Sequence, residues 1–222
     1  MKNKIFTFLL FLSGISCWNA QKLNFSDKVF EKAVIEKFDL NKDGAIDQSE
    51  ADKVVNLFIS NKIKVRSADD INFFKNVQTV VLDGSIIISV TLKNLDKLSL
   101  FSCEACNMLD FQAENLKNLT SLYLNGNKLT QISLKNTPEL YELVLSSNSL
   151  TSLDVSPLKK LITLNIENNR ISSLDLSNNP EIWKLMTKNN PLQETDIKRA
   201  KTAAVKVPAA SSAAPKKPGN GN

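Results

Sequence analysis

Residues 119–129 read LTSLYLNGNKL and place apolar residues and one asparagine at fixed intervals, in the pattern L-x-x-L-x-L-x-x-N-x-L. The pattern recurs through six units with a 21-residue period, and its first column comprises Val77, Leu98, Leu119, Leu140, Leu161 and Ile182. A unit of this length cannot bury its apolar side chains alone, so successive units must stack. The sequence therefore predicts a solenoid whose coils each add one row of aliphatic side chains to a continuous core.

The spacing within one unit predicts the path of each coil. Leu122 and Leu124 alternate with Tyr123, as in a short strand whose apolar side faces inward. Such strands are expected to stack into a parallel sheet on the concave side. A second alternating pair, Ile132 and Leu134, leaves no room for a full helix on the convex side, where turns and extended segments are expected.

The column that contains Asn127 is expected to point inward at a turn and to hydrogen bond with backbone groups of neighbouring coils. Cys106 occupies the same column, and Cys103 occupies a leucine column. Across the six coils the apolar columns comprise 36 positions, and only Thr187 and Thr195 are polar. Both lie in the last coil, where the open edge of a solenoid has to be closed.

The two cysteines, Cys103 and Cys106, would suggest a disulfide in an exported protein. In an extended chain, however, three residues separate their Cα atoms by roughly 10 Å, which is beyond disulfide reach. The sequence therefore favours buried free thiols. A zinc or redox site would need more cysteines or histidines, and the chain has no second cysteine pair and no histidine.

Residues 39–50 read DLNKDGAIDQSE and lie upstream of the regular repeats. Oxygen-bearing side chains alternate along this stretch, and Gly44 stands where such a loop turns sharply. Its four carboxylates would repel one another without a cation. Calcium prefers about six to eight hard oxygen ligands. The sequence thus predicts one Ca²⁺ site, with a metal-free acidic turn as the alternative, and its ligands would be Asp39, Asn41, Asp43, the Ala45 carbonyl, Asp47 and Glu50.

Helices are predicted on both sides of this loop. Apolar residues recur at helical spacing along residues 27–38, and Ser26 or Asp27 can cap this helix. After the loop, a short helix over 48–54 is favoured because residues 55–59 have strand spacing, and the alternative is a helix to about residue 60. The result is a helix–loop–helix cap over 26–54, followed by repeats over 55–197, the first of them degenerate.

Residues 1–20 have the features of a secretory signal peptide. Lys2 and Lys4 precede an apolar stretch, residues 5–15, that is too short to span a bilayer. We expect cleavage near Ala20, and the alternative is a lipid anchor at Cys17. The sequence therefore predicts a secreted or cell-surface protein, with a periplasmic or lipid-anchored location as the alternative. No other apolar stretch is long enough to cross a membrane.

The chain carries 28 basic and 23 acidic residues, a net charge of +5, but the basic excess is local. Residues 21–197 contain 20 basic and 23 acidic groups, or −3, whereas residues 198–222 contain six basic groups and no acidic one. This distribution argues against nucleic-acid binding. One capping helix is expected over 193–202. The basic, Ala-, Pro- and Lys-rich tail of the 198–222 region is expected to be disordered.

Taken together, these features show that the segment 28–197 resembles secreted bacterial leucine-rich-repeat proteins that carry an EF-hand calcium loop just before the first coil. The likeness rests on the loop at 39–50 and on the repeat columns. It implies an exported calcium-binding solenoid used for interaction, and it does not indicate a particular ligand. The degenerate first coil and Thr187 depart from the more regular members of that family.

Catalysis is not expected, because the chain has no histidine for a nucleophilic triad and no Gly-rich phosphate loop. The outward residues of the concave sheet form the candidate partner surface instead. We expect the partner to be a protein or a surface glycan that contacts Thr79, Val81, Leu100, Ser102, Ser121, Tyr123, Glu142, Val144, Asn165 and Met186. The alternative is a structural surface module without a dedicated ligand, in which calcium only stabilises the N-terminal end of the solenoid.

Overall fold

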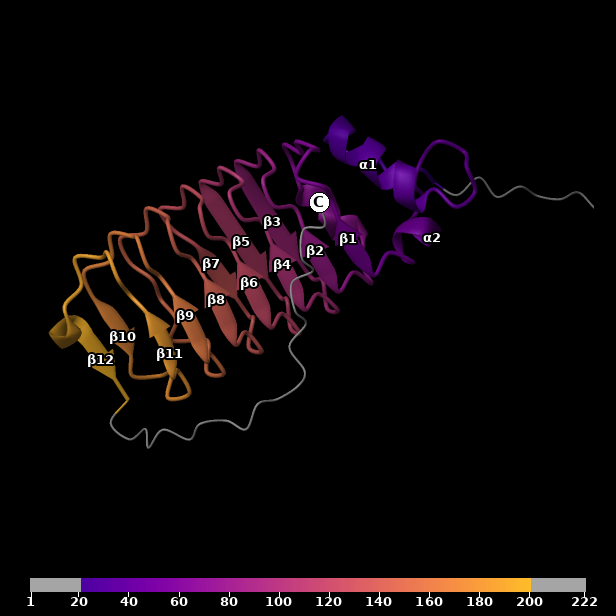
Figure 1. Cartoon of the computed structure of the whole chain (residues 1–222). Coiled ribbons are helices and arrows are strands. Elements are labelled where there is room, and N and C mark those ends of the chain that lie inside the picture. Colours follow the sequence, from indigo (N-terminus) through magenta and orange to yellow (C-terminus); the bar gives the residue numbers. More distant parts are fainter. Residues whose placement is uncertain (1–20, 201–222) are drawn as a thin grey trace, which may run out of the picture.

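The computed structural model describes residues 21–200, which form a solenoid with two helices at its N-terminal end and a short strand at its C-terminal end (Figure 1). The predicted signal peptide, with Cys17, and the chain beyond Ala200 lie outside the described residues. Within residues 21–200 the helices are too short and too polar to pass through a bilayer.

Seven parallel strands, one from each coil, form the long sheet of the solenoid. From β2 onward the strands follow one another with the 21-residue period of the sequence, whereas the interval from the start of β1 to the start of β2 is slightly longer. The parallel sheet predicted from the repeat is confirmed, and the degenerate first coil belongs to it. Its strands are β1 (Asn56–Phe58), β2 (Thr79–Val81), β4 (Leu100–Ser102), β6 (Ser121–Tyr123), β8 (Glu142–Val144), β9 (Thr163–Asn165) and β11 (Lys184–Met186).

The opposite side of the coils carries extended segments, as predicted. β3 (Ser89–Lys93), β5 (Asp110–Glu114) and β7 (Ser133–Lys135) form a parallel three-stranded sheet. Further along, β10 (Leu174–Leu176) pairs in parallel with β12 (Ile197–Arg199). Along β3, β5 and β10, buried side chains alternate with more exposed ones, so these coils close around their apolar columns on both sides.

One apolar core runs along the solenoid between these two sides. Leu122, Leu124, Leu143 and Leu145 are all 0% exposed, as their columns predict. Fully burying one such side chain contributes roughly 1.5–3 kcal/mol, so the stacked rows supply most of the folding free energy.

The N-terminal helices pack directly on the first coil. α1 (Lys28–Phe38) matches the predicted helix, and Asp27 caps it by accepting hydrogen bonds from the amides of Val29 and Phe30. α2 (Gln48–Ala51) is even shorter than the predicted 48–54 helix, and β1 follows at Asn56. Aromatic rings from both sides of the junction, with centroids 5.5 to 6.3 Å apart, join this end to the coil through Phe25, Phe30, Phe73 and Phe74.

The C-terminal end differs from the prediction. No capping helix forms over 193–200: a 3-10 turn, η2 (Glu194–Asp196), is followed by β12. Leu174 pairs with Ile197, whereas the regular period would pair it with Thr195, so this coil has two extra residues and Ile197 occupies the apolar column. The predicted helix was wrong for two reasons. The 3-10 turn η2 accommodates the two extra residues, and β12 then forms backbone hydrogen bonds with the otherwise unpaired edge of β10.

The prediction of free thiols was also wrong, because Cys103 and Cys106 form a disulfide. Their Cα atoms are 5.7 Å apart rather than roughly 10 Å, since the chain turns between them. Ala105 has a positive φ of 52°, which provides the sharp change of direction that the extended-chain argument overlooked. Both cysteines are 0% exposed, as predicted from their columns.

The turn after each strand of the long sheet, from β2 onward, needs a left-handed backbone. The same position has positive φ in six successive coils, one repeat period apart, and φ ranges from 52° to 71°. Glycine and asparagine tolerate this conformation, but alanine and serine pay a steric penalty. The residues in this column are Gly84, Ala105, Gly126, Ser147, Asn168 and Asn189.

Candidate functional site

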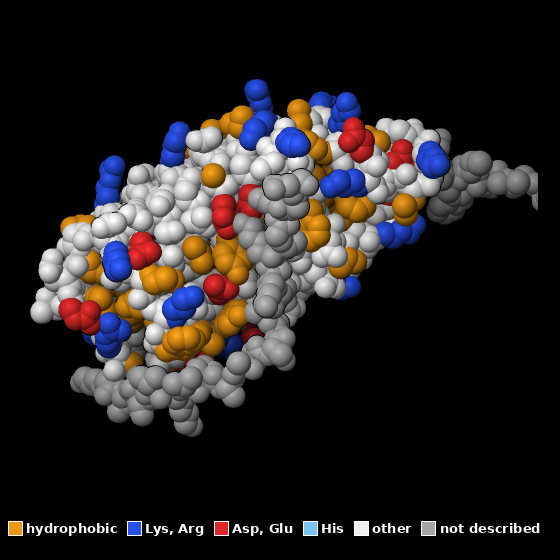
Figure 2. Space-filling view, viewed as in Figure 1, with side chains coloured by type: hydrophobic (Ala, Val, Ile, Leu, Met, Phe, Trp, Pro, Cys, Tyr) orange, Lys and Arg blue, Asp and Glu red, His pale blue; other side chains and the backbone are white. Residues whose placement is uncertain are grey.

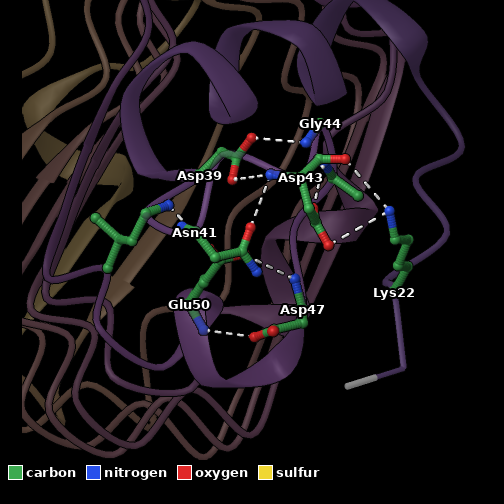
Figure 3. A network of polar contacts seen from close by, with 9 residues as sticks. Lys22, Asp39, Asn41, Asp43, Gly44, Asp47 and Glu50 are labelled. Carbon is green, nitrogen blue, oxygen red and sulfur yellow. Dashed lines mark hydrogen bonds and ion pairs between the residues drawn. The ribbon is translucent and has the colours of Figure 1, made fainter. Parts of the chain in front are cut away.

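The acidic loop lies between α1 and α2, and its own side chains hold it curled (Figure 3). Asp39 accepts hydrogen bonds from the amides of Asp43, at 3.2 Å, and Gly44, at 2.9 Å. Asn41 accepts from the amide of Asp43 at 2.8 Å, and Asp43 accepts from that of Ala45 at 3.0 Å. Gly44, with φ of 79°, allows the sharp turn expected at this position. Three of the predicted ligand side chains are therefore turned toward the interior of one loop.

The last two predicted side-chain ligands, Asp47 and Glu50, start the helix that follows. They form a capping box, in which each side chain accepts a hydrogen bond from the backbone amide of the other, at 2.9 and 3.1 Å. Glu50 also accepts from the amides of Leu40, at 2.8 Å, and Asn41, at 3.1 Å. Only 4% of Glu50 is exposed, so this carboxylate ties the end of the loop back to its beginning.

The chain just before α1 completes the loop in a way that the sequence analysis missed. Leu23 donates its amide to the carbonyl of Ile46 at 2.8 Å, and Lys22 forms an antiparallel bridge with Asp47. The Lys22 ammonium lies 3.4 Å from both the backbone carbonyl and a carboxylate oxygen of Asp43 (Figure 3). A cation therefore already contacts the acidic loop. No repeat or motif in the sequence marked this contact.

The chemistry of the donor set fits a hard cation, although the acidic groups are spread out in this conformation. Within residues 21–200, no three His, Cys, Asp or Glu side chains converge closely enough to form a metal site. The loop nevertheless offers only oxygen ligands, and the Lys22 ammonium lies 3.4 Å from a carboxylate oxygen of Asp43. Bound Ca²⁺ would be held by Asp39, Asn41, Asp43, the Ala45 carbonyl, Asp47 and Glu50, and it would neutralise the mutual repulsion of the four carboxylates.

The predicted partner residues lie on the strands of the long sheet at matching register positions. Of the ten, four are buried: Val81, Leu100, Ser102 and Ser121. The other six are half-buried: Thr79, Tyr123, Glu142, Val144, Asn165 and Met186. The structure therefore brings the ten residues onto one sheet, with the more accessible ones mainly on its C-terminal half. Hydrophobic and charged side chains are interspersed on the face seen in Figure 2.

Tyr123 and Glu142 form a polar contact at the centre of this sheet. The Tyr123 hydroxyl donates to a Glu142 carboxylate oxygen at 2.7 Å, across the paired strands β6 and β8. Burial, together with this hydrogen bond, raises the pKa of Tyr123 well above its ordinary value. The phenol therefore stays protonated and fixes the Glu142 carboxylate in place. Val144 is paired with Tyr123 in the same ladder, so an aromatic, an acidic and an aliphatic side chain adjoin.

Among the comparisons with known proteins, a likeness to a solved structure supports the fold. No protein-family model matches the chain, and no curated protein matches it. Internalin C2 from Listeria monocytogenes is 20% identical over 77% of this chain and 87% of that chain, with a TM-score of 0.50. A leucine-rich-repeat protein of Leptospira interrogans is 21% identical over 66% of this chain, with a TM-score of 0.48, and the match spans 46% of that protein's length. With its stacked 21-residue coils and parallel strands, the chain has the fold of a leucine-rich-repeat solenoid.

Proposed function

We propose that this chain is an exported calcium-binding protein that acts as an interaction module and binds a partner protein through the long sheet. The carrying observation is the accessible part of that sheet, where Tyr123 on β6, Glu142 and Val144 on β8, and Met186 on β11 present mixed chemistry. Aromatic residues and methionine are enriched in the cores of protein interfaces. A stack of short strands offers an extended surface for such a partner.

Calcium belongs to the proposal because the acidic loop supplies a full oxygen donor set at the solenoid end. The loop is short, packed against the first coil and tied to the preceding chain by Leu23. Its proposed role is to stabilise that end by binding the folded state. Binding rather than catalysis is proposed, since the sequence contains no histidine and no phosphate loop.

Export is supported by the disulfide between Cys103 and Cys106, because structural disulfides persist mainly in oxidising compartments. The predicted signal peptide points the same way. We therefore place the proposed interaction outside the cytoplasm.

The test is capture of partners from the native environment on immobilised protein, with wild type and a Tyr123→Ala/Val144→Ser variant in parallel. Neither side chain lies in a core column, so the variant should keep the wild-type circular dichroism spectrum, although loss of the Tyr123–Glu142 hydrogen bond should lower its melting temperature. Truncating an aromatic anchor at an interface can cost about 2 kcal/mol or more, or roughly 30-fold in affinity. Loss of a partner by the folded variant supports the proposal. Equal capture by both proteins, with a melting temperature that rises with calcium, favours the purely structural alternative.

A further inference from the structure

An open groove of about 640 Å³ lies between α1 and the segment 62–66 of the first coil, away from the long sheet. Its lining includes only one acidic residue, Glu36. Five basic residues border it on both walls: Lys28 and Lys32 from α1, and Lys62, Lys64 and Arg66 from the coil. Residues 21–197 are acidic overall, at −3, so this concentration of positive charge is local. At the α1 end of the molecule, Figure 2 shows basic side chains beside hydrophobic ones.

Most of these cations are not neutralised by the described part of the chain. Lys28 forms an exposed ion pair with Glu31 at 2.8 Å, and Lys64 donates to the Gly84 carbonyl at 2.6 Å. Within residues 21–200, the side chains of Lys32, Lys62 and Arg66 have no ion pair. All three are exposed. The groove therefore presents positive charge that an external anion can satisfy.

The groove also has an apolar lining, formed by Val29, Ala33 and Ile63. Val29 is 44% exposed, whereas Phe30, Ala33 and Val34 of the same helix are buried against the core. Exposed apolar residues continue on the adjoining coils. Ile86 is 38% exposed, and its amide donates to the carbonyl of Val65, beside the groove. Ile88 is 51% exposed, and Leu109, whose amide donates to the Ile88 carbonyl, is 47% exposed.

One buried carboxylate fixes the two walls relative to each other. Asp27 accepts hydrogen bonds from the amides of Val29 and Phe30 in α1, and from the amides of Arg66 and Ser67 on the opposite wall. Asp27 is only 8% exposed. A groove held in this way does not have to form when a ligand arrives, so less ordering entropy is lost on binding.

We propose that this groove binds an acidic, partly apolar peptide segment of a partner protein. Charge complementarity requires an anion, and the apolar lining favours one that carries aliphatic side chains. Lys28 and Lys32 are one helical turn apart, about 6 Å along α1. Lys64 and Arg66 lie on either side of the buried Val65, which spaces these two cations by about 6.6 Å in an extended chain, whereas Lys62 lies in the turn that Ile63 closes by donating its amide to the Ser60 carbonyl.

An extended peptide with acidic residues at alternate positions repeats its charges at the same interval of about 6.6 Å. Lysine ammonium groups are mobile point charges, so they suit several separated carboxylates better than one compact, planar anion. The chain's own C-terminal tail is excluded as the occupant by its charge, because residues 198–222 carry six basic groups and no acidic one. The surface is thus a second interaction site, independent of the long sheet.

The probe is a fluorescent peptide of about ten residues with glutamate at alternate positions and leucine or serine between them. Its binding to the full exported chain is measured by fluorescence anisotropy, at low and at physiological salt, with calcium and with a chelator. The charge-reversal variant is Lys32→Glu/Arg66→Glu. The matched control, Lys97→Glu/Lys128→Glu, makes the same charge change at two exposed lysines outside the groove. Thermal melts establish that both variants are folded.

We expect the groove variant to bind the peptide at least about tenfold more weakly than wild type, and the control variant to stay within about twofold. A peptide with glutamine in place of glutamate should not bind, and the result should be the same with and without calcium. Equal weakening in both variants would overturn the proposal, since it would show nonspecific attraction. No peptide binding at roughly 100 µM would also overturn it, as would groove-dependent binding of heparin, of anionic vesicles or of a second copy of the chain without binding of the peptide.

Discussion

At the scale of single residues, the turn after each strand of the long sheet, from β2 onward, depends on one left-handed position. Gly126 has φ of 68° there, and Ser147 adopts φ of 56° one coil later without the freedom of glycine. A Cβ on Gly126 would come within 3.6 Å of the Ala105 amide nitrogen, an ordinary contact. Any effect of substitution at Gly126 is therefore conformational rather than a clash.

We expect Gly126→Ala to lower the free energy of unfolding by about 1 kcal/mol, because alanine is strained at positive φ. Ser147→Ala is the matched control, since it exchanges two residues that share the same strain. Urea denaturation of both variants measures the difference. A Gly126→Ala protein as stable as wild type, or a Ser147→Ala protein that loses as much stability, would refute the role assigned to this column.

Asp27 is the second residue whose effect can be isolated. Burial raises its pKa, but hydrogen bonds from four backbone amides outweigh burial and hold the pKa below its ordinary value. Because the folded pKa is lower than the unfolded value of about 3.9, the stabilisation is present above that value and is lost as pH falls through the folded pKa.

We therefore expect Asp27→Asn to cost about 1–2 kcal/mol at neutral pH, since an amide group cannot accept all four hydrogen bonds. The difference in free energy of unfolding between wild type and variant should become smaller as the pH is lowered below about 4. Urea midpoints at several pH values measure this gap. Asp96→Asn, at an exposed carboxylate with only a surface ion pair, should give a much smaller gap. An Asp27→Asn gap that does not change with pH would contradict the explanation.

At the scale of elements, one turn of the solenoid is closed covalently where its neighbours use hydrogen bonds. The Asn127 amide group donates to the carbonyls of Leu124, in its own coil, and Cys103, in the preceding coil, at 2.9 and 2.8 Å. Asn148 repeats both contacts one coil later. Cys103 and Cys106 occupy the positions equivalent to Leu124 and Asn127. Their disulfide therefore closes the turn that asparagine closes elsewhere.

Reduction should therefore destabilise the wild-type chain by about 2 kcal/mol, the chain-entropy estimate for a loop this short. A Cys103→Leu/Cys106→Asn variant restores the ordinary pattern of the repeat, so its melting temperature should not depend on a reducing agent. Thermal melts with and without dithiothreitol compare the two proteins. If reduction leaves the wild-type melting temperature unchanged, the disulfide does not carry this role.

At the scale of the whole molecule, the coils and their core could be predicted because the same apolar positions recur in every 21-residue unit of the sequence. The 21-residue period defined the columns, the parallel strands and the buried leucines. The ends were harder, since each occurs only once: two extra residues in the last coil moved Ile197 into the column assigned to Thr195. The disulfide was missed because an extended path was assumed between Cys103 and Cys106. The Lys22 contact with Asp43 depends on tertiary packing and left no pattern.

The packing of α1 and α2 on the first coil limits the conformational change that calcium can cause. α1 is locked to the first coil by packed phenylalanine rings, and α2 leads within a few residues into β1. The helices have little freedom to swing apart as they do in calcium sensors. We therefore expect calcium to stabilise the folded solenoid without reshaping it, by about 1.4 kcal/mol at ten times the dissociation constant.

The most direct test is thermal unfolding followed by far-ultraviolet circular dichroism, with millimolar calcium and with a chelator, on wild type and Glu50→Gln. The variant removes one charge and the carboxylate proposed to close the site. We expect calcium to raise the wild-type melting temperature, to leave the spectrum of the folded protein nearly unchanged and to have little effect on Glu50→Gln. If calcium leaves the wild-type melting temperature unchanged, or adds a large helical signal to the spectrum, the proposed stabilising role of calcium is contradicted.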